Sequence, residues 1–163
     1  MHNFEGIERE ELIEVDKSLE SFMEVVGPRL NTLLMAQCPT IPNYYFSLLG
    51  RKQVGMLQTL DLSENRELTT EALISITKGS PNLESLTLDA CRLTDTGAFA
   101  IADNCLKIKH LNLSRCSVSD SALSYVGLKL NKCQNLILAG NFAMTDKVCL
   151  WICSAMTLCS LFW

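Results

Sequence analysis

Cysteine is the residue type in this sequence that could most readily carry out chemistry. The 163-residue chain contains eight cysteines and two histidines. A zinc site needs four ligands close together, but only Cys149, Cys153 and Cys159 lie near one another, with no histidine beside them. A catalytic thiol needs a base partner, whereas His2 lies in the terminus and His110 in a predicted strand. We therefore predict no metal site, and we expect the thiols to be small buried apolar groups.

Other catalytic arrangements are also missing from the sequence. The segment from Gly50 to Gly55 lacks the pattern of a nucleotide-binding loop. Paired carboxylates, or a nucleophile with its base, do not occur at a workable spacing. We predict that the protein is not an enzyme, that it needs no cofactor and that it has no small-molecule substrate.

Composition and charge narrow the kinds of partner. Hydrophobic residues make up 48% of the chain and charged residues 20%, as in a globular protein. Residues 1–24 carry a net charge of −6, against −4 for the whole chain, and no basic stripe follows, so a nucleic-acid partner is not expected.

The acidic start has no apolar signal segment, which predicts an intracellular protein with reduced thiols. The uncharged segment 148–163 has 16 residues, fewer than the ~20 of a spanning helix, so membrane insertion is not expected.

A repeated pattern of leucines, closed by asparagine or cysteine, organises the chain. Three segments follow the pattern L-x-x-L-x-L-x-x-N/C, and two more follow it with one substitution each. The closing residues lie 27, 26, 25 and 25 positions apart, and a further unit begins at Leu158. Each segment predicts a short strand with alternate leucines turned inward. The five segments are Leu30–Cys38, Leu57–Asn65, Leu83–Cys91, Ile108–Cys116 and Cys133–Asn141.

The second half of each unit predicts a helix. Apolar residues at positions i, i+1 and i+4 form one buried stripe, as in Ala72, Leu73 and Ile76. A hydroxyl residue precedes each helix, where it can accept a hydrogen bond from a free amide of the first turn. These cap residues are Thr69, Thr94, Ser119 and Thr145, and three of them are followed by an aspartate, Asp95, Asp120 or Asp146, where the helix dipole favours negative charge.

These motifs resemble the cysteine-containing leucine-rich repeat. Such repeats are found in F-box/leucine-rich-repeat proteins and in ribonuclease-inhibitor-like proteins. The resemblance implies an α/β fold, a right-handed βα superhelix of about five repeats with parallel strands on the concave face. It also implies protein binding. In the F-box family the repeats often select substrates for a ubiquitin ligase, and similar repeats occur in assembly factors of mitochondrial complexes and in ciliary complexes.

The repeat frame divides the chain into three parts. Residues 1–9 are predicted to be an acidic disordered tail, and residues 10–29 a capping helix or half repeat that covers the first strand. Residues 30–163 form the leucine-rich-repeat domain. The helix around 148–156 is apolar nearly all round and includes Trp151, so we expect another chain or further repeats to cover the C-terminal edge.

The side chains between the inward leucines should face outward on the concave sheet. In the middle of this sheet face the side chains are small and polar, which leaves room for a side chain of a partner protein. Asp61, Glu64 and Asp89 are expected to cluster there and to favour a basic knob on the partner. The predicted partner-binding residues are Asp61, Ser63, Glu64, Thr87, Asp89, His110, Asn112, Ser114, Arg115, Ile137, Phe162 and Trp163.

Three hypotheses of function remain open from the sequence. The leading one is a non-catalytic protein-interaction module that binds a partner protein through the concave sheet, the C-terminal edge, or both. The alternatives are the substrate-recognition part of an F-box-type ubiquitin ligase and a structural or assembly subunit of a large mitochondrial or ciliary complex. The expected location is the cytoplasm or nucleus, with the mitochondrion and the cilium left open.

Overall fold

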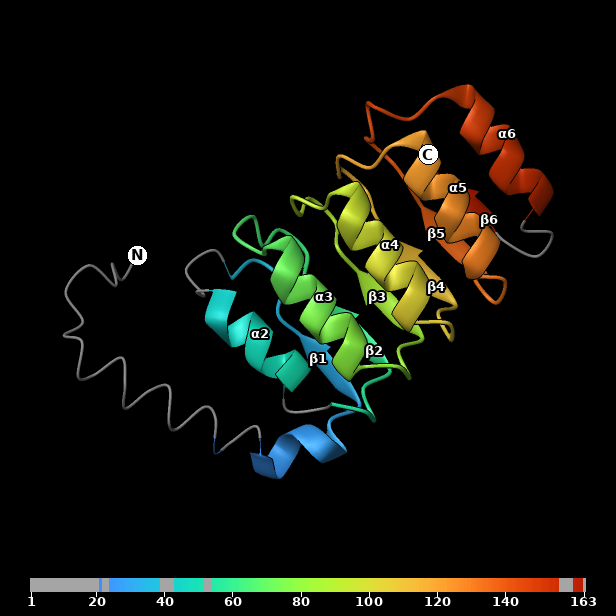
Figure 1. The fold of residues 1–163 in the computed structure, drawn as a ribbon. Helices are drawn as coiled ribbons and strands as arrows, with labels where there is room; N and C mark the ends of the chain where they lie inside the picture. Colours follow the sequence, from blue (N-terminus) through green and yellow to red (C-terminus); the bar gives the residue numbers. More distant parts are fainter. Residues whose placement is uncertain (1–20, 22–23, 39–42, 52–53, 156–159, 163) are drawn as a thin grey trace.

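One parallel sheet of six strands forms the inner side of a curved, repeating structure (Figure 1). The computed structural model describes residues 21, 24–38, 43–51, 54–155 and 160–162. The strands follow one another in chain order, and a helix lies between each pair of neighbours. The strands are β1 (Thr32–Leu34), β2 (Thr59–Asp61), β3 (Ser85–Thr87), β4 (His110–Asn112), β5 (Asn135–Ile137) and β6 (Ser160–Phe162). A short 3-10 helix η1 (Gly27–Arg29) precedes them, and the helices are α2 (Asn43–Arg51), α3 (Thr70–Gly79), α4 (Asp95–Asn104), α5 (Asp120–Lys129) and α6 (Asp146–Ala155).

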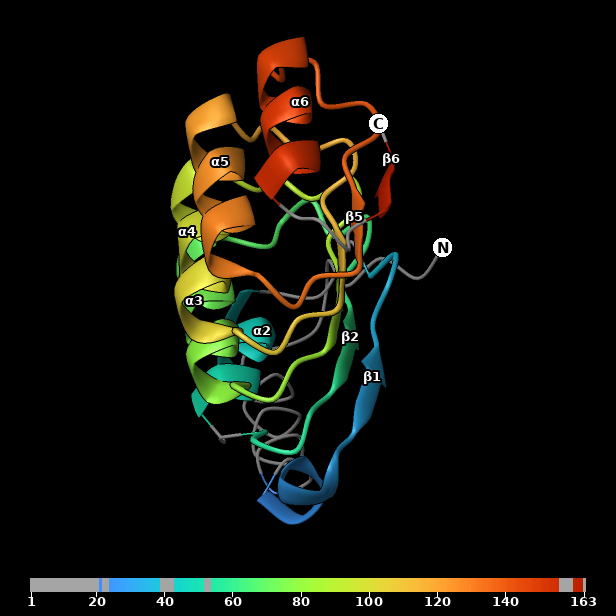
Figure 2. The same ribbon diagram turned by 90° about the vertical axis from the view of Figure 1, so that its right-hand side faces the viewer.

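The strands and helices form two layers with the core between them (Figure 2). The central leucine of each internal strand points into the core, and Leu60, Leu86, Leu111 and Leu136 are at most 1% exposed. The helices bury the opposite stripe, in which Ile76 and Ile101 are fully buried. Because one unit cannot bury its apolar face alone, the units are stable only as a stack. This architecture confirms the predicted leucine-rich-repeat solenoid.

The asparagine that closes the second unit joins neighbouring turns of the stack. Asn65 is 1% exposed. Its Nδ2 donates to the backbone carbonyls of Met35 at 2.6 Å and Leu62 at 2.8 Å, and its Oδ1 accepts from the amide of Cys38 at 3.1 Å. One side chain therefore satisfies backbone groups of two turns that have no strand partner there.

Cysteine takes the same place in the next two units. The Cys91 thiol donates to the carbonyl of Leu62 at 3.1 Å, and the Cys116 thiol donates to that of Leu88 at 3.3 Å. In the fifth unit Asn141 again makes the amide version, with Nδ2 2.8 Å from the carbonyl of Leu113 and Oδ1 accepting from Cys116 N at 3.1 Å. Asparagine and cysteine therefore occupy equivalent places in one ladder along the stack.

The helices α2 and α3 approach closely because glycines line their contact. A Cβ on Gly50 would lie 2.2 Å from the backbone carbonyl of Ser75, and a Cβ on Gly79 would lie 2.6 Å from the carbonyl oxygen of Gly50. Both distances are far inside van der Waals contact, so no larger residue fits without moving a helix. Gly97 holds a similar place on α4, where a Cβ would lie 2.5 Å from the Cδ1 of Leu93.

The predicted helix caps are correct in two helices and wrong in a third. Thr69 accepts a hydrogen bond from the amide of Ala72, and Ser119 accepts one from the amide of Ala122. Thr94 makes no side-chain cap, and its hydroxyl lies 3.1 Å from that of Thr70. The Thr145 hydroxyl donates to Asp120. Some of these hydroxyl residues therefore also join neighbouring repeats, and Ser119 does both.

The ends of the chain limit which domain predictions the structure addresses. The tail predicted at residues 1–9 and most of the capping element predicted at 10–29 lie outside the described residues. Of that element, Gly27–Arg29 form η1, next to β1. Trp163 also lies outside the described residues.

Candidate protein-binding surface

The outward side chains of the strands stand in two columns, because the parallel register aligns equivalent residues. Thr59, Ser85, His110 and Asn135 pair in sequence along one column. In the other column Asp61, Thr87, Asn112 and Ile137 are each half-buried, and β1 adds Leu34, which is 67% exposed. For Phe162 the structure describes the backbone, which places it in register with Ile137 on β6.

A shallow hollow lies on the strand face between β3, β4 and β5. Its volume is about 140 Å³, close to the ~150 Å³ of an apolar cavity that accepts a benzene ring. Leu86 and Leu111 line it although their side chains point into the core, and the outward side chains around it are those of Thr87, His110, Asn112, Asn135 and Ile137. We call it the strand-face hollow. It has room for one side chain of a partner, and its outward side chains are mostly polar, with Ile137 as the apolar one.

The polar walls of the strand-face hollow are held by local hydrogen bonds. Asn112 Oδ1 accepts from the amide of Ser114 at 2.9 Å and from its hydroxyl at 2.6 Å. The Nδ2 of Asn135 lies 2.9 Å from the Nδ1 of His110, so the amide can donate to the neutral ring and fix its orientation. Ser114 is only 7% exposed. Its side chain therefore orients Asn112 and offers little surface of its own to a partner.

Asp61 and Ser63 repeat this arrangement on β2. The Asp61 Oδ1 accepts from the amide of Ser63 at 2.9 Å and from its hydroxyl at 2.6 Å. One oxygen of this carboxylate thus already has two donors, which lowers its capacity to bind a cation on a partner.

An arginine from the next repeat pairs with two of the three residues of the expected acidic cluster. Arg115 donates to both oxygens of Asp89, at 2.8 Å from Nε and 2.5 Å from Nη2, and its Nη2 lies 3.6 Å from Glu64. Hydrogen bonding to Asp89 raises the pKa of the Arg115 guanidinium above its ordinary value. The idea of a basic knob docking on Asp61, Glu64 and Asp89 is corrected accordingly, because this chain supplies its own base.

The residue after each strand turn has a left-handed backbone. Four of the five are not glycine, and their φ values of +52° to +60° are sterically costly for such residues. A tight turn recurs in every unit and directs these side chains to the edge of the sheet. The residues are Gln37 (φ 56°), Glu64 (φ 60°), Ala90 (φ 56°), Arg115 (φ 52°) and Gly140 (φ 73°).

The aspartates at the helix starts hold neighbouring repeats together, which sequence reasoning missed. Asp95 accepts from the amide and the hydroxyl of Ser119, at 2.8 and 2.6 Å. Asp120 accepts from the amide of Thr145 at 2.9 Å and from its hydroxyl. The sequence signal for this contact is an aspartate followed by a hydroxyl residue about 25 positions later. From the sequence, these aspartates are explained by the helix dipole alone. Asp146 has the corresponding place on α6.

The outer face of α6 differs from the surfaces between repeats. A hollow of about 250 Å³ is lined by Asp146, Cys149, Leu150 and Cys153. Leu150 is 73% exposed, and Trp151 is half-buried. β6 pairs with β5 alone among the described strands. These features correspond to the expectation of an apolar C-terminal edge.

Most of the described thiols are small buried groups, as the sequence predicts. Cys91, Cys105, Cys116, Cys133 and Cys149 are buried, Cys38 is half-buried and Cys153 is exposed. Burial raises the pKa of Cys91 to about 11 and those of Cys105 and Cys116 to about 12. Such thiols are almost fully protonated at neutral pH and are weak nucleophiles. Within the described ranges no group of three or more His, Cys, Asp or Glu is placed to hold a metal ion.

Comparison with known proteins identifies the class that this fold defines. A family model described as "Leucine Rich repeat" matches residues 56–76, 79–102 and 104–127. These are consecutive units of the solenoid, and the strands, helices and ladder continue the same frame on both sides. The matched residues are leucine-rich repeats, and the fold is that of a leucine-rich-repeat solenoid.

Two curated proteins are similar over part of their length. The chain is 35% identical over 103 residues to the antagonist of mitotic exit network protein 1 of Eremothecium gossypii, which spans 61% of this chain and 25% of that protein. It is 36% identical over 88 residues to the F-box protein SKIP17 of Arabidopsis thaliana, which spans 52% of this chain and 18% of that protein. The chain thus matches a quarter or less of either relative.

Two solved structures share the fold. The actin-binding site 2 of leiomodin-1 superposes with a TM-score of 0.63 at 12% identity, over 86% of each chain. The C-terminal domain of Caenorhabditis elegans tropomodulin superposes with a TM-score of 0.64 at 12% identity, over 86% of this chain and 90% of that one. None of the described helices has the length and apolarity that a membrane crossing demands.

Proposed function

We propose that this protein is a non-catalytic interaction module whose strand face binds a partner protein. The observation that carries the proposal is the strand-face hollow, which is lined by outward side chains of three neighbouring strands, mostly polar and including the apolar Ile137. A partner inserts one side chain there and lays its surface along the two columns. Two features support a scaffold role for the rest of the fold. The buried thiols are weak nucleophiles, and the ladder side chains donate hydrogen bonds to backbone carbonyls of neighbouring turns.

Rigidity is the physical basis of such binding. His110 is oriented by Asn135, and Asn112 is oriented by Ser114, so the walls of the hollow are already held in place before a partner arrives. A surface held in this way loses little conformational entropy on binding. The free thiols favour a reducing, intracellular compartment as the place of action.

The test is to fill the hollow and leave the helix layer intact. Thr87→Arg places a long side chain in the hollow, and Leu128→Arg is its matched control, because Leu128 is 67% exposed on α5 in the opposite layer. Cross-linking mass spectrometry should recover a partner with the wild-type chain and with Leu128→Arg, and lose that partner with Thr87→Arg. Equal recovery with both variants would sink the proposal.

A second candidate function is substrate recognition in a ubiquitin ligase. The 36% identity to an F-box protein favours it, although the matched part spans 18% of that protein. In this case the partner bound by the strand face is a ligase substrate. Its ubiquitylation should rise when this protein is expressed, and Thr87→Arg should abolish the rise. Unchanged ubiquitylation of a captured partner excludes this role.

A third candidate is a structural subunit covered at its C-terminal edge. Leu150, Cys153 and the free edge of β6 favour it, because an internal repeat covers the same places on α5 and β5. Light scattering combined with acrylamide quenching of Trp151 fluorescence tests it. If light scattering gives the mass of one chain and acrylamide strongly quenches Trp151, nothing covers this edge. Such a result would rule out a cover by another chain and by further repeats.

A further inference from the structure

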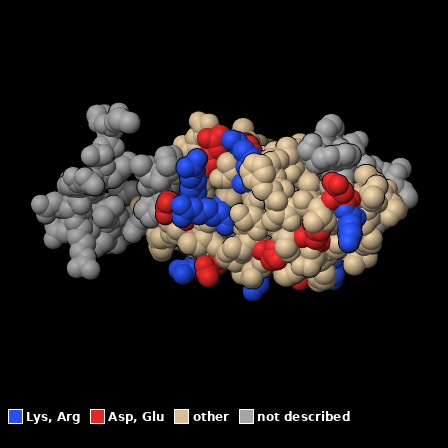
Figure 3. Space-filling model, turned by 90° about the horizontal axis from the view of Figure 1, so that it is seen from above, with Lys and Arg blue, Asp and Glu red and all other residues tan. Residues whose placement is uncertain are grey.

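A second hollow lies at the edge of the solenoid where the strands run into the helices. Its volume is about 630 Å³, and the charged residues among its walls are all arginines, namely Arg66, Arg92 and Arg115. Thr94 and Ser117 add two hydroxyls. We call it the arginine hollow. Viewed from this edge, Lys and Arg atoms gather on one part of the described surface (Figure 3).

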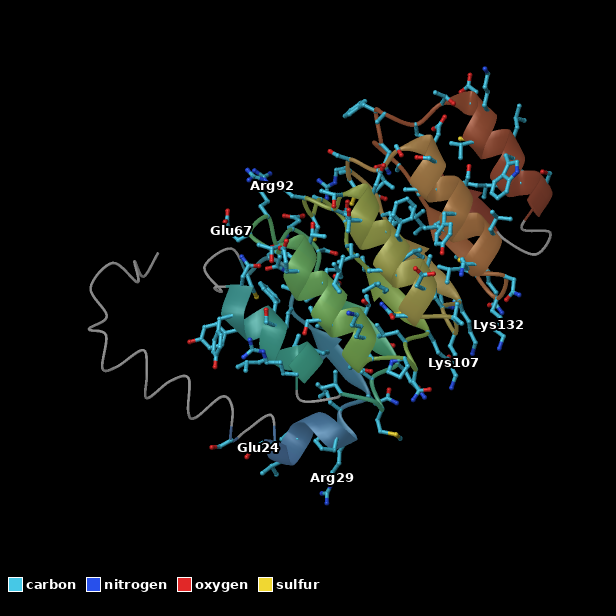
Figure 4. The ribbon with its side chains drawn as sticks, in the orientation of Figure 1. Glu24, Arg29, Glu67, Arg92, Lys107 and Lys132 are labelled. Carbon is cyan, nitrogen blue, oxygen red and sulfur yellow. The ribbon has the colours of Figure 1, made fainter. Side chains whose placement is uncertain are left out.

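Two of the three arginines are free to bind. Arg66 follows the ladder residue Asn65, and Arg92 follows the ladder residue Cys91, so they occupy equivalent places on neighbouring turns. Both are exposed, and neither guanidinium forms a hydrogen bond or an ion pair with any part of the chain that the structure describes. Arg115 is different, because it is bound to Asp89. Figure 4 shows Arg92 projecting outward from this edge, with Glu67 nearby.

The acidic residues of this edge define where an anion can sit. Glu67 and Glu71 line a smaller adjoining hollow of about 320 Å³, which shares Arg66 and Arg92. They do not line the arginine hollow. Two arginines and two glutamates balance in charge at the smaller hollow, so an anion is attracted more strongly to the larger one. The expected position of the anion is therefore the arginine hollow.

We propose that the arginine hollow binds an acidic side chain of a partner protein, a carboxylate or a phosphate, between Arg66 and Arg92. A guanidinium presents a planar fork of donors that matches either group, and two such forks from adjacent repeats hold it from both sides. The hydroxyls of Thr94 and Ser117 supply further donors. The site lies apart from the strand-face hollow, with which it shares no residue.

The experiment is fluorescence anisotropy at low ionic strength with three labelled peptides of equal length. One carries glutamates, one carries a phosphoserine among neutral residues, and one carries glutamines. Wild-type protein should bind at least one of the two anionic peptides and not the neutral one. Arg66→Ala/Arg92→Ala should weaken that binding about tenfold or more. The ratio between the two anionic peptides identifies carboxylate or phosphate as the ligand.

The matched control removes two positive charges from the opposite edge. Lys107→Ala/Lys132→Ala makes the same change in net charge, and both lysines lie on the edge away from Arg92 (Figure 4). It should change the affinity less than about twofold, since distant exposed charges are screened. Arg66→Lys/Arg92→Lys keeps the charge but loses the fork, and an intermediate affinity is expected. Absence of binding to both anionic peptides, or equal losses in the arginine and lysine variants, overturns the proposal without touching the role of the strand face.

Discussion

Replacing Asn65 by alanine should destabilise the solenoid by an amount that its hydrogen bonds define. The carbonyl of Leu62 keeps a donor in Cys91, but the carbonyl of Met35 and the amide of Cys38 lose the partner that Asn65 provides. An unsatisfied buried polar group costs about 1–3 kcal/mol. Because both groups are only partly buried, we expect the free energy of unfolding to fall by about 2–4 kcal/mol in total.

Asn65→Cys makes the argument sharper. A thiol at this place can donate to the Met35 carbonyl as Cys91 donates to Leu62, but it cannot accept from the Cys38 amide. The loss in unfolding free energy should therefore be about half that of the alanine variant. Asn135→Ala serves as a control, because this half-buried asparagine bonds only a side chain at the surface, and it should cost less than about 0.5 kcal/mol.

The measurement is urea unfolding followed by circular dichroism, extrapolated linearly to zero denaturant. The expected order of stability is wild type, Asn65→Cys, then Asn65→Ala. A cysteine variant as unstable as the alanine variant would refute the idea that the two residue types are interchangeable donors in one ladder. A loss below about 0.5 kcal/mol for alanine would show that water satisfies both backbone groups.

Two further predictions concern the thiols and the glycine contact. Cys91, Cys105 and Cys116 have a pKa of about 11 to 12 in the folded chain. Because the same thiols ionise at about pH 8.5 in the unfolded chain, the free energy of unfolding should fall as the pH rises from about 8.5 towards those values. The expected slope is about 1.4 kcal/mol per pH unit for each thiol. Urea unfolding at rising pH checks this, and a flat profile between pH 8 and 10 contradicts it. Gly50→Ala should lower the melting temperature through a loss of about 1–3 kcal/mol, since its Cβ would lie 2.2 Å from backbone atoms of Ser75; an unchanged melting curve would mean that the two helices separate without cost.

The repeat frame could be predicted from sequence because every part of it is local. Leucine spacing sets the strands, and the ladder residue follows each strand at a fixed interval. The left-handed turn was not predicted, because only Gly140 carries its usual signal while Ala90 and Arg115 adopt the same backbone. The pairing of Arg115 with Asp89 was missed for a different reason. It joins neighbouring strands, so it follows only when the columns of adjacent repeats are compared together.

The glycine contact between α2 and α3 also affects the curvature of the binding face. Neighbouring strands of a sheet are about 4.8 Å apart, whereas packed helices are usually 8–10 Å apart, and this difference bends a stack with the strands inside. Gly50 and Gly79 bring two helices closer than larger side chains allow. We therefore expect the arc to be flatter at β1–β3 than at β4 and β5. A partner that follows the whole strand face must match a broad, shallow surface at the first strands and a tighter one around the strand-face hollow.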